Sequence, residues 1–338
     1  MAAGANIVAL VDMDTERARK AAEEYAVPHY YGSLSESLTK HQVNFVSICT
    51  FASTHLPLAK TALAAGCAVL LEKPVANSLE EAQELRRAAE ESGRPVCVVH
   101  NHKFYPGIQE AVQLHRAGRI GEVVHVDRQM TFLHSRIRMM EPDHWAHGLP
   151  GGRLFEANPH NLYLAYQFAG RMQLESLHAW KASARWPHAK IDEFTASLRG
   201  ERATVQITMT MNLEEGAHYL RHGANFLVVT GTKGTLLVGY HRCQFLDVAL
   251  TMHLHHLLRD TGRAAKASAG ARLRRLLPQR PQTPFHDGAA TGHKHVIERF
   301  VGHLEGRYPE PPTTWAEVLE TQRLNEEMGT EAEKQGRC

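Results

Sequence analysis

The sequence predicts an α/β fold in which a Rossmann-like domain with a parallel sheet precedes an α+β domain with a mostly antiparallel, open sheet. Apolar segments at 7–11, 45–49, 68–71 and 95–100 alternate with helical segments at 16–25, 57–65 and 79–92. This alternation is typical of βαβ units. After residue 104, segments of alternating polarity predict further strands at 123–132, 174–181, 193–199, 204–212, 225–230 and 234–238. We therefore expect a nucleotide-binding domain over 1–103, an α+β substrate domain over 104–312, and a C-terminal helix and tail over 313–338.

The composition indicates a globular protein, because 43% of the 338 residues are hydrophobic, 22% are charged and the formal net charge is +2. The five cysteines are scattered without a Cys-x-x-Cys pair. This distribution favours a reducing compartment over a disulfide framework or a zinc ribbon. No stretch approaches the roughly 18 apolar residues of a membrane helix, and no signal peptide is visible. We expect a cytoplasmic protein with no membrane partner.

The segment Val69 to Pro74 organises the first domain. A short apolar run, typical of a buried parallel strand, ends in Glu72, Lys73 and a proline. Ligands bind at the carboxyl ends of the strands in an open α/β sheet, so we expect Glu72 and Lys73 to lie at the mouth of a cofactor crevice. The alternative is a surface ion pair that caps the strand.

Asp12 ends the first apolar segment, where an acid usually binds the adenosine ribose hydroxyls of a dinucleotide. Its charge would repel a 2′-phosphate, which favours NAD over NADP, although NADP stays possible. The alternative is an aspartate that only caps the following helix. A Gly-x-Gly-x-x-Gly turn does not precede this strand, and Gly4 resembles the cap of an earlier helix. We expect either that Met1 is an internal methionine of a longer protein, the reading we favour, or that the pyrophosphate site has been lost.

Four blocks of residues together resemble the glucose–fructose oxidoreductase / inositol dehydrogenase / MocA family of nicotinamide-dependent enzymes. They lie in that family's order and spacing over residues 6–163. The blocks are the strand ending at Asp12 with Arg17-Ala18; Thr50 to His55 with Ala62 to Gly66; Glu72-Lys73-Pro74; and Gly151 to His160.

The resemblance implies which residues bind the cofactor. Phe51 and Ala52 stand where the family has proline and asparagine, and Ala52 cannot make the asparagine's hydrogen bond. Without the family, His55 reads as an ordinary histidine at a helix start. The cofactor contacts implied are Asp12, Thr50, Phe51, His55, Glu72, Lys73 and Asn101.

The resemblance also implies the catalytic residues, in which Lys73 holds the substrate oxygen and His160 exchanges its proton. Histidine suits this task because its ordinary pKa lies near 6.5. Glu156 replaces the usual aspartate and would orient the other two. It either shares a helical face with His160, four residues on, or approaches from a loop if Asn158-Pro159 starts the helix. A His160 that only packs on the sheet is the structural alternative. Trp145 and Tyr163 are candidate substrate-side residues.

These observations predict an oxidoreductase that moves a hydride between NAD(P) and a secondary alcohol or ketone of a sugar, polyol or inositol-like substrate. One alternative is a non-catalytic or regulatory binding protein that keeps the fold. Another is a lyase or glycosidase of the same family that uses NAD as a transient hydride acceptor. The family resemblance implies a homo-oligomer, a dimer or tetramer.

Residues 251–280 carry three histidines and a run of arginines and lysines. They lack interleaved aromatic residues and ligand spacing for a metal, so we expect a solvated flap, no nucleic-acid partner and no metal. Contact with an anionic substrate, such as a sugar phosphate or nucleotide sugar, is the alternative.

Overall fold

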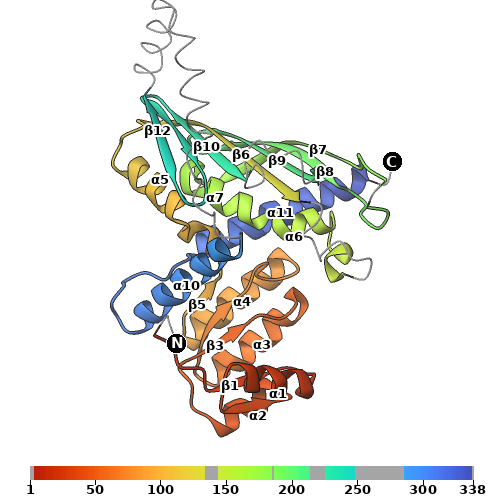
Figure 1. The fold of residues 1–338 in the computed structure, drawn as a ribbon, viewed down its shortest axis with the longest axis vertical. Helices are drawn as coiled ribbons and strands as arrows, with labels where there is room; N and C mark the ends of the chain where they lie inside the picture. Colours follow the sequence, from red (N-terminus) through yellow and green to blue (C-terminus); the bar gives the residue numbers. More distant parts are fainter. Residues whose placement is uncertain (1–3, 134–143, 185, 214–224, 248–284, 337–338) are drawn as a thin grey trace, which may run out of the picture.

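The computed structural model describes residues 4–133, 144–184, 186–213, 225–247 and 285–336. Figure 1 shows a smaller α/β part that contains the N-terminal elements and, across from it, a broad sheet with helices on one face. The predicted α/β class with a parallel first part and a mostly antiparallel second part is confirmed. The basic segment 251–280 lies outside the described residues.

The N-terminal part alternates short strands and helices. Strand β1 pairs with β2 in parallel, and β3, β4 and β5 form a second parallel sheet. No strand joins these two sheets within the ranges described. The elements are β1 (Ala9–Val11), α1 (Thr15–Glu24), β2 (His29–Tyr31), α2 (Leu34–Lys40), β3 (Phe45–Ile48), α3 (Ala52–Ala64), β4 (Ala68–Leu71), α4 (Leu79–Ser92) and β5 (Val96–Val98).

Helix α3 begins five residues earlier than the predicted 57–65. Phe51 is its N-cap residue, and the backbone N–H of Thr54 already closes the first turn on the Phe51 carbonyl at 2.9 Å. Pro57 therefore lies inside the helix. The prediction placed Pro57 in the first helical position, where proline is most common, so the early turn was missed.

Strand β4 is buried on both faces, as its continuous apolar run predicts. Val69 and Leu71 pack toward α3 and α4. Ala68 and Leu70 pack on the opposite face against α10 (Phe285–Leu304), mainly through Phe300. The second face of this parallel sheet is thus covered by a helix from near the end of the chain, inside the segment assigned by sequence to the second domain.

The second part is built on a seven-stranded sheet in the order β12-β11-β10-β6-β9-β8-β7. All neighbours are antiparallel except β6 and β9, which run parallel. Its elements are η1 (Asn101–Phe104), α5 (Pro106–Arg116), β6 (Val123–Leu133), η4 (Trp145–Gly148), α6 (Arg153–Ala157), α7 (Pro159–Ala169), β7 (Met172–Trp180), β8 (Glu193–Gly200), β9 (Thr204–Leu213), β10 (Phe226–Gly231), β11 (Gly234–Val238) and β12 (Cys243–Asp247).

Helix α11 (Trp315–Gln335) connects the two parts (Figure 1). Near its middle, a Glu326 carboxylate oxygen accepts the backbone N–H of Leu79 at 2.6 Å, at the start of α4. Near its end, Gln335 donates to the carbonyl of Leu177 in β7 at 2.8 Å. Thr314 caps the helix, since its hydroxyl accepts the N–H of Glu317. None of the described helices is long and apolar enough to cross a membrane.

Replacement of Phe300 by alanine tests whether α10 stabilises the parallel sheet. Phe300 is completely buried and its ring meets Phe45 edge-on with centroids 5.5 Å apart. We expect the free energy of unfolding in urea to fall by about 3–5 kcal/mol, because the removed ring leaves a cavity. Met13→Ala, at a side chain that is 93% exposed, is the control and changes stability by less than about 0.5 kcal/mol. Equal stability of the two variants would contradict the role given to α10.

Candidate active site

Lys73 reaches from the carboxyl end of β4 into the second domain. Its ammonium group donates to the carbonyl of Glu156 at 3.1 Å and forms an ion pair with the Glu156 carboxylate, which also binds Arg153. Burial by itself raises the pKa of the Glu156 carboxyl, but Lys73 and Arg153 outweigh burial and lower it. The site therefore contains an ionised carboxylate between two cations, and these charged groups come from both domains.

The turn before α6 explains how Glu156 is aimed at Lys73. Gly151 and Gly152 both have positive φ angles, and a Cβ atom on Gly151 would lie 2.1 Å from the ring of Phe155. Pro159 occupies the first position of α7, as predicted. Asn158 keeps helical angles and does not cap α7 with its side chain. Glu156 therefore approaches from the short helix α6 and not from a loop, so the helix already runs at this position as the first alternative required.

His160 lies at the start of α7, where Tyr163 and His102 contact its ring. Its Nδ1 atom is 2.6 Å from the Tyr163 hydroxyl, and its ring stacks on His102 with centroids 3.9 Å apart. Burial, followed by His102 and Lys73, holds the pKa of His160 well below its usual range. Burial and then Arg128 do the same for the pKa of His102. Both imidazoles are neutral near pH 7.

The two candidate substrate-side residues have different environments. Trp145 lies in η4, and its ring is 5.6 Å from that of Phe51, which is 56% exposed at the end of β3. This aromatic pair spans the two domains at the rim of the crevice. Tyr163 is completely buried, so an effect on the substrate would act through His160 rather than by contact.

The residues implied as cofactor contacts lie at the ends of parallel strands. Asp12 follows β1, and one of its oxygens accepts the N–H of Asp14 at 2.9 Å while Arg17 lies 3.5 Å from the other. Thr50 follows β3. His55 is completely buried, and its ring bonds the backbone carbonyls of Thr50 at 3.0 Å and Val75 at 3.3 Å. His55 therefore fixes the loops after β3 and β4 rather than facing the crevice.

Sequence reasoning missed His293, which joins two of these residues. Its Nε2 is 3.2 Å from the Glu72 carboxylate and its Nδ1 is 3.3 Å from the Asn101 amide nitrogen. The neighbouring Gly292 has no room for a Cβ atom, which would lie 2.6 Å from the Asn101 carbonyl oxygen. No local motif marks His293, because its partners are about 190 and 220 positions away.

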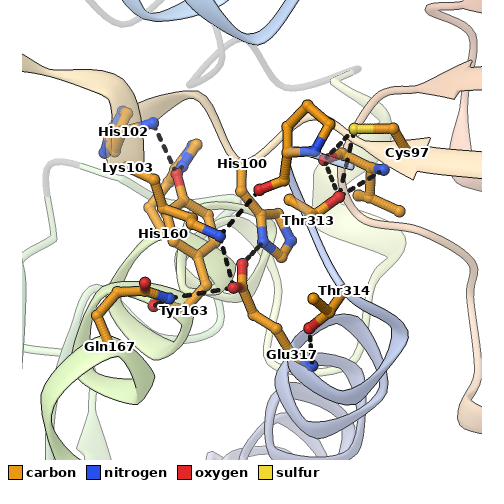
Figure 2. Close-up of polar contacts among 12 residues, drawn as sticks. Cys97, His100, His102, Lys103, His160, Tyr163, Gln167, Thr313, Thr314 and Glu317 are labelled. Atoms are coloured by element: carbon orange, nitrogen blue, oxygen red, sulfur yellow. Dashed lines mark hydrogen bonds and ion pairs between the residues drawn. The ribbon is translucent and has the colours of Figure 1, made fainter. Parts of the chain in front are cut away.

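Sequence reasoning also missed a buried cluster around Glu317, next to Tyr163. Figure 2 shows its residues converging from η1, α7 and α11. The Glu317 carboxylate pairs with His100 Nδ1, lies 2.6 Å from Lys103 Nζ and accepts from Gln167 at 3.1 Å. Burial by itself raises the pKa of Glu317, but Lys103 and His100 lower it to about 2. His100 stacks on Tyr163 with centroids 4.2 Å apart. Glu317 was not among the predicted site residues, because its partners lie at least 150 positions away in the sequence.

Within the described ranges, no group of three or more His, Cys, Asp or Glu side chains is arranged to hold a metal ion. The charged side chains at the crevice are instead paired with one another, as for Lys73 with Glu156 and His293 with Glu72.

Fold and site together define a two-domain nucleotide-binding protein with a lysine, a carboxylate and a histidine at the carboxyl end of a parallel sheet. Residues 1–100 match the model of the oxidoreductase family with an NAD-binding Rossmann fold, and residues 108–237 match the GFO/IDH/MocA C-terminal domain. The chain therefore belongs to the GFO/IDH/MocA family, which confirms the resemblance seen in the sequence.

Individual relatives are more distant or only partly aligned. D-apiose dehydrogenase of Paraburkholderia graminis is 37% identical over 118 residues, which are 35% of this chain and 32% of that enzyme. The chain spans about a third of the length of the first curated relatives it matches. An Agrobacterium radiobacter oxidoreductase solved with NAD⁺, L-tartaric acid and magnesium has a TM-score of 0.74 at 19% identity, covering 99% of this chain and 90% of that one. The Bordetella pertussis WlbA dehydrogenase, solved with NADH and UDP-GlcNAcA, has a TM-score of 0.72 at 20% identity, covering 97% and 88%. These structures share the fold.

Replacement of Glu317 by glutamine tests the buried cluster. Removal of the carboxylate leaves Lys103 buried without its anion, and we expect a loss of about 3–5 kcal/mol in the free energy of unfolding at neutral pH. The folded pKa of Glu317 is about 2, below the ordinary value of 4.5. The carboxylate therefore stabilises the fold above about pH 4.5, and this contribution is lost as the pH falls through about 2.

The measurement is denaturant unfolding of both proteins between about pH 7 and pH 2. The difference between wild type and Glu317→Gln shrinks at the acid end. Glu36→Gln removes an exposed ion pair with Lys40, and this control loses less than about 1 kcal/mol. A pH-independent difference would show that the charge of Glu317 does not matter.

Proposed function

We propose that this protein is an NAD(P)-dependent oxidoreductase that transfers a hydride between the nicotinamide and a secondary alcohol or ketone of a sugar, polyol or inositol-like substrate. The observation that carries the proposal is the contact between Lys73, at the carboxyl end of β4, and Glu156, which comes from the second domain four residues before His160. Lys73 is close enough to lower the pKa of His160, and Glu156 holds Lys73 in place. Membership of the GFO/IDH/MocA family supports the same reaction class.

The described residues fit the two ends of NAD. At one end, the Asp12 side chain is partly exposed after β1, where a carboxylate accepts the hydrogen bonds of ribose hydroxyls. At the other end, Glu72, Lys73 and Asn101 surround the place where a nicotinamide would lie. Arg17 beside Asp12 offers a cation to a 2′-phosphate, so NADP stays the second candidate. When bound, the nicotinamide supplies the hydride acceptor or donor.

The residues of this chain would then position the substrate. Two of the three N–H groups of the Lys73 ammonium are used by Glu156, which leaves one for the substrate oxygen. Trp145 and Phe51 offer aromatic faces on which the C–H face of a ring could pack.

The test of this proposal is a spectrophotometric assay for NADH formation with the full chain, NAD⁺ or NADP⁺, and a panel of alcohols. D-Apiose, myo-inositol and UDP-N-acetylglucosamine enter the panel because relatives are named for apiose, myo-inositol and UDP-N-acetylglucosamine dehydrogenases. We expect turnover with at least one cyclic polyol or sugar. In Lys73→Met we expect kcat to fall by about 10²–10⁴-fold with NAD binding retained, because the cation that holds the substrate oxygen is lost. Lys60→Met, at a surface ion pair with Glu84, is the matched control with wild-type activity. NAD binding without turnover on any alcohol would favour the binding-protein alternative.

Asp12 gives a separate prediction about cofactor binding. In Asp12→Asn we expect the Kd for NAD to rise about 10- to 100-fold, because hydrogen bonds to a charged acceptor are worth about 1.5–3 kcal/mol. The measurement is calorimetric titration with NAD and with NADP. Glu91→Gln, an exposed change on α4, is the control. The structure gives the N-cap of α1 to Asp14, which corrects the alternative in which Asp12 caps this helix. Unchanged NAD affinity in Asp12→Asn would leave Asp12 only as an acceptor for the backbone N–H of Asp14.

A further inference from the structure

The hydroxyl of Tyr163 determines which nitrogen of His160 carries the proton. This hydroxyl accepts the backbone N–H of His102 at 3.1 Å and lies 2.6 Å from His160 Nδ1. Tyr163 is completely buried, and the described part of the chain gives its hydroxyl no third partner. Since a backbone N–H can only donate, the phenol proton is left for His160 Nδ1.

The opposite arrangement is costly. If His160 Nδ1 donated to the phenol, the phenol oxygen would accept twice and its own proton would be buried without an acceptor. His160 Nδ1 is therefore the acceptor, and the proton of the neutral ring is on Nε2. Among the described residues, Nε2 of His160 has no hydrogen-bond partner and is not enclosed. It is the atom available to a substrate.

The surroundings of His160 oppose a second proton on the ring. His102 stacks on it from η1, Lys73 acts on it from the end of β4, and Arg128 acts from β6. Arg128 is 1% exposed and donates to Asn161 Oδ1 at 2.9 Å and to the Phe226 carbonyl at 3.0 Å. It has no carboxylate partner in the ranges described, so its charge is not neutralised.

Three further groups face this pair of imidazoles. His100 adds to the unfavourable environment for a charge on His160, and Tyr105 and Tyr240 contact the His102 ring. The phenol of Tyr163 stays protonated, because burial raises its pKa well above the usual value.

We propose that Tyr163 is a positioning residue that fixes His160 as a neutral Nε2–H donor to the substrate oxygen, and that Lys73 exchanges the hydroxyl proton. This inference rests on the proposed function. It assigns the proton to a different residue from the one that sequence reasoning suggested, and it gives the buried Tyr163 a role without substrate contact.

The step balances in the reducing direction, in which Lys73 starts as the ammonium that pairs with Glu156. The carbonyl carbon accepts the hydride that NADH supplies, a C–H bond forms, and the C=O π electron pair moves onto the oxygen. One N–H bond of the Lys73 ammonium breaks, its proton forms the new O–H bond, and the neutral amine left behind regains a proton from water. His160 keeps its proton throughout and donates a hydrogen bond to the oxygen as negative charge develops there.

The first test reads the tautomer without requiring turnover. Protein labelled with ¹⁵N-histidine is studied by long-range ¹H–¹⁵N correlation spectra, and the His160 signals among 23 histidines are those absent from His160→Gln. We expect a protonated Nε2 and an unprotonated Nδ1 at pH 7. In Tyr163→Phe the signals shift toward a mixture of tautomers, because the phenol donor is gone. A wild-type His160 with its proton on Nδ1, or a doubly protonated ring, would overturn the inference.

The second test separates donation from proton exchange, using the panel substrate with the highest turnover. His160→Ala removes the donor, and we expect kcat to fall by about 10²–10³-fold. A glutamine amide can donate from near the Nε2 position but cannot exchange a proton, so His160→Gln recovers most of that loss. If His160 exchanged the proton, its titration would produce a limb in the pH profile of wild-type kcat/KM that is absent from His160→Gln. We expect instead that the two pH profiles have the same limbs.

If kcat falls as much in His160→Gln as in His160→Ala while NAD binding is intact, the inference is overturned. His160 would then be the residue that exchanges the proton. A failure of the proposed function looks different. In that case no panel substrate is turned over by the wild type, whereas the tautomer spectrum still shows whether Tyr163 controls His160.

Discussion

The ion pair between Lys73 and Glu156 is the contact on which the arrangement of the site depends. Its two partners come from different domains, and both are largely withdrawn from water. Burying the Glu156 carboxylate costs desolvation free energy, which one ion pair need not offset. The second cation, Arg153, helps to offset this cost. At this point the two domains therefore meet through paired charges rather than through apolar side chains. Such a pattern positions the Lys73 ammonium before any substrate arrives.

The same construction occurs a second time behind the histidines. Glu317 from α11 lies between Lys103 and His100, as Glu156 lies between Lys73 and Arg153. Through His100 the second carboxylate supports the ring of Tyr163, and through Tyr163 it reaches His160. His160 is thus held by neutral contacts and Lys73 by charged ones. This division keeps positive charge on Lys73 and away from His160.

Sequence reasoning predicted what depends on local pattern. The alternation of strands and helices gave the fold class, and the residues after β1, β3 and β4 were placed at one edge of the sheets. Glu156 and Lys73 were expected to act together, and they do meet. What could not be predicted depends on long-range packing. His293, Arg128 and Glu317 lie far along the chain from their partners, and no spacing rule relates them. The burial of His55 and Tyr163 likewise follows from packing that a motif does not encode.

Helix α10 places one constraint on how this chain reaches its native state. The parallel sheet is encoded before residue 100, yet one of its faces is closed by Val296 and Phe300. During synthesis that apolar face stays uncovered while roughly two hundred more residues are made, which at about 5–20 residues per second takes on the order of ten seconds or more. The nucleotide-binding domain is therefore finished last although it is begun first. Its early strands are the part of the nascent chain that most needs protection from aggregation.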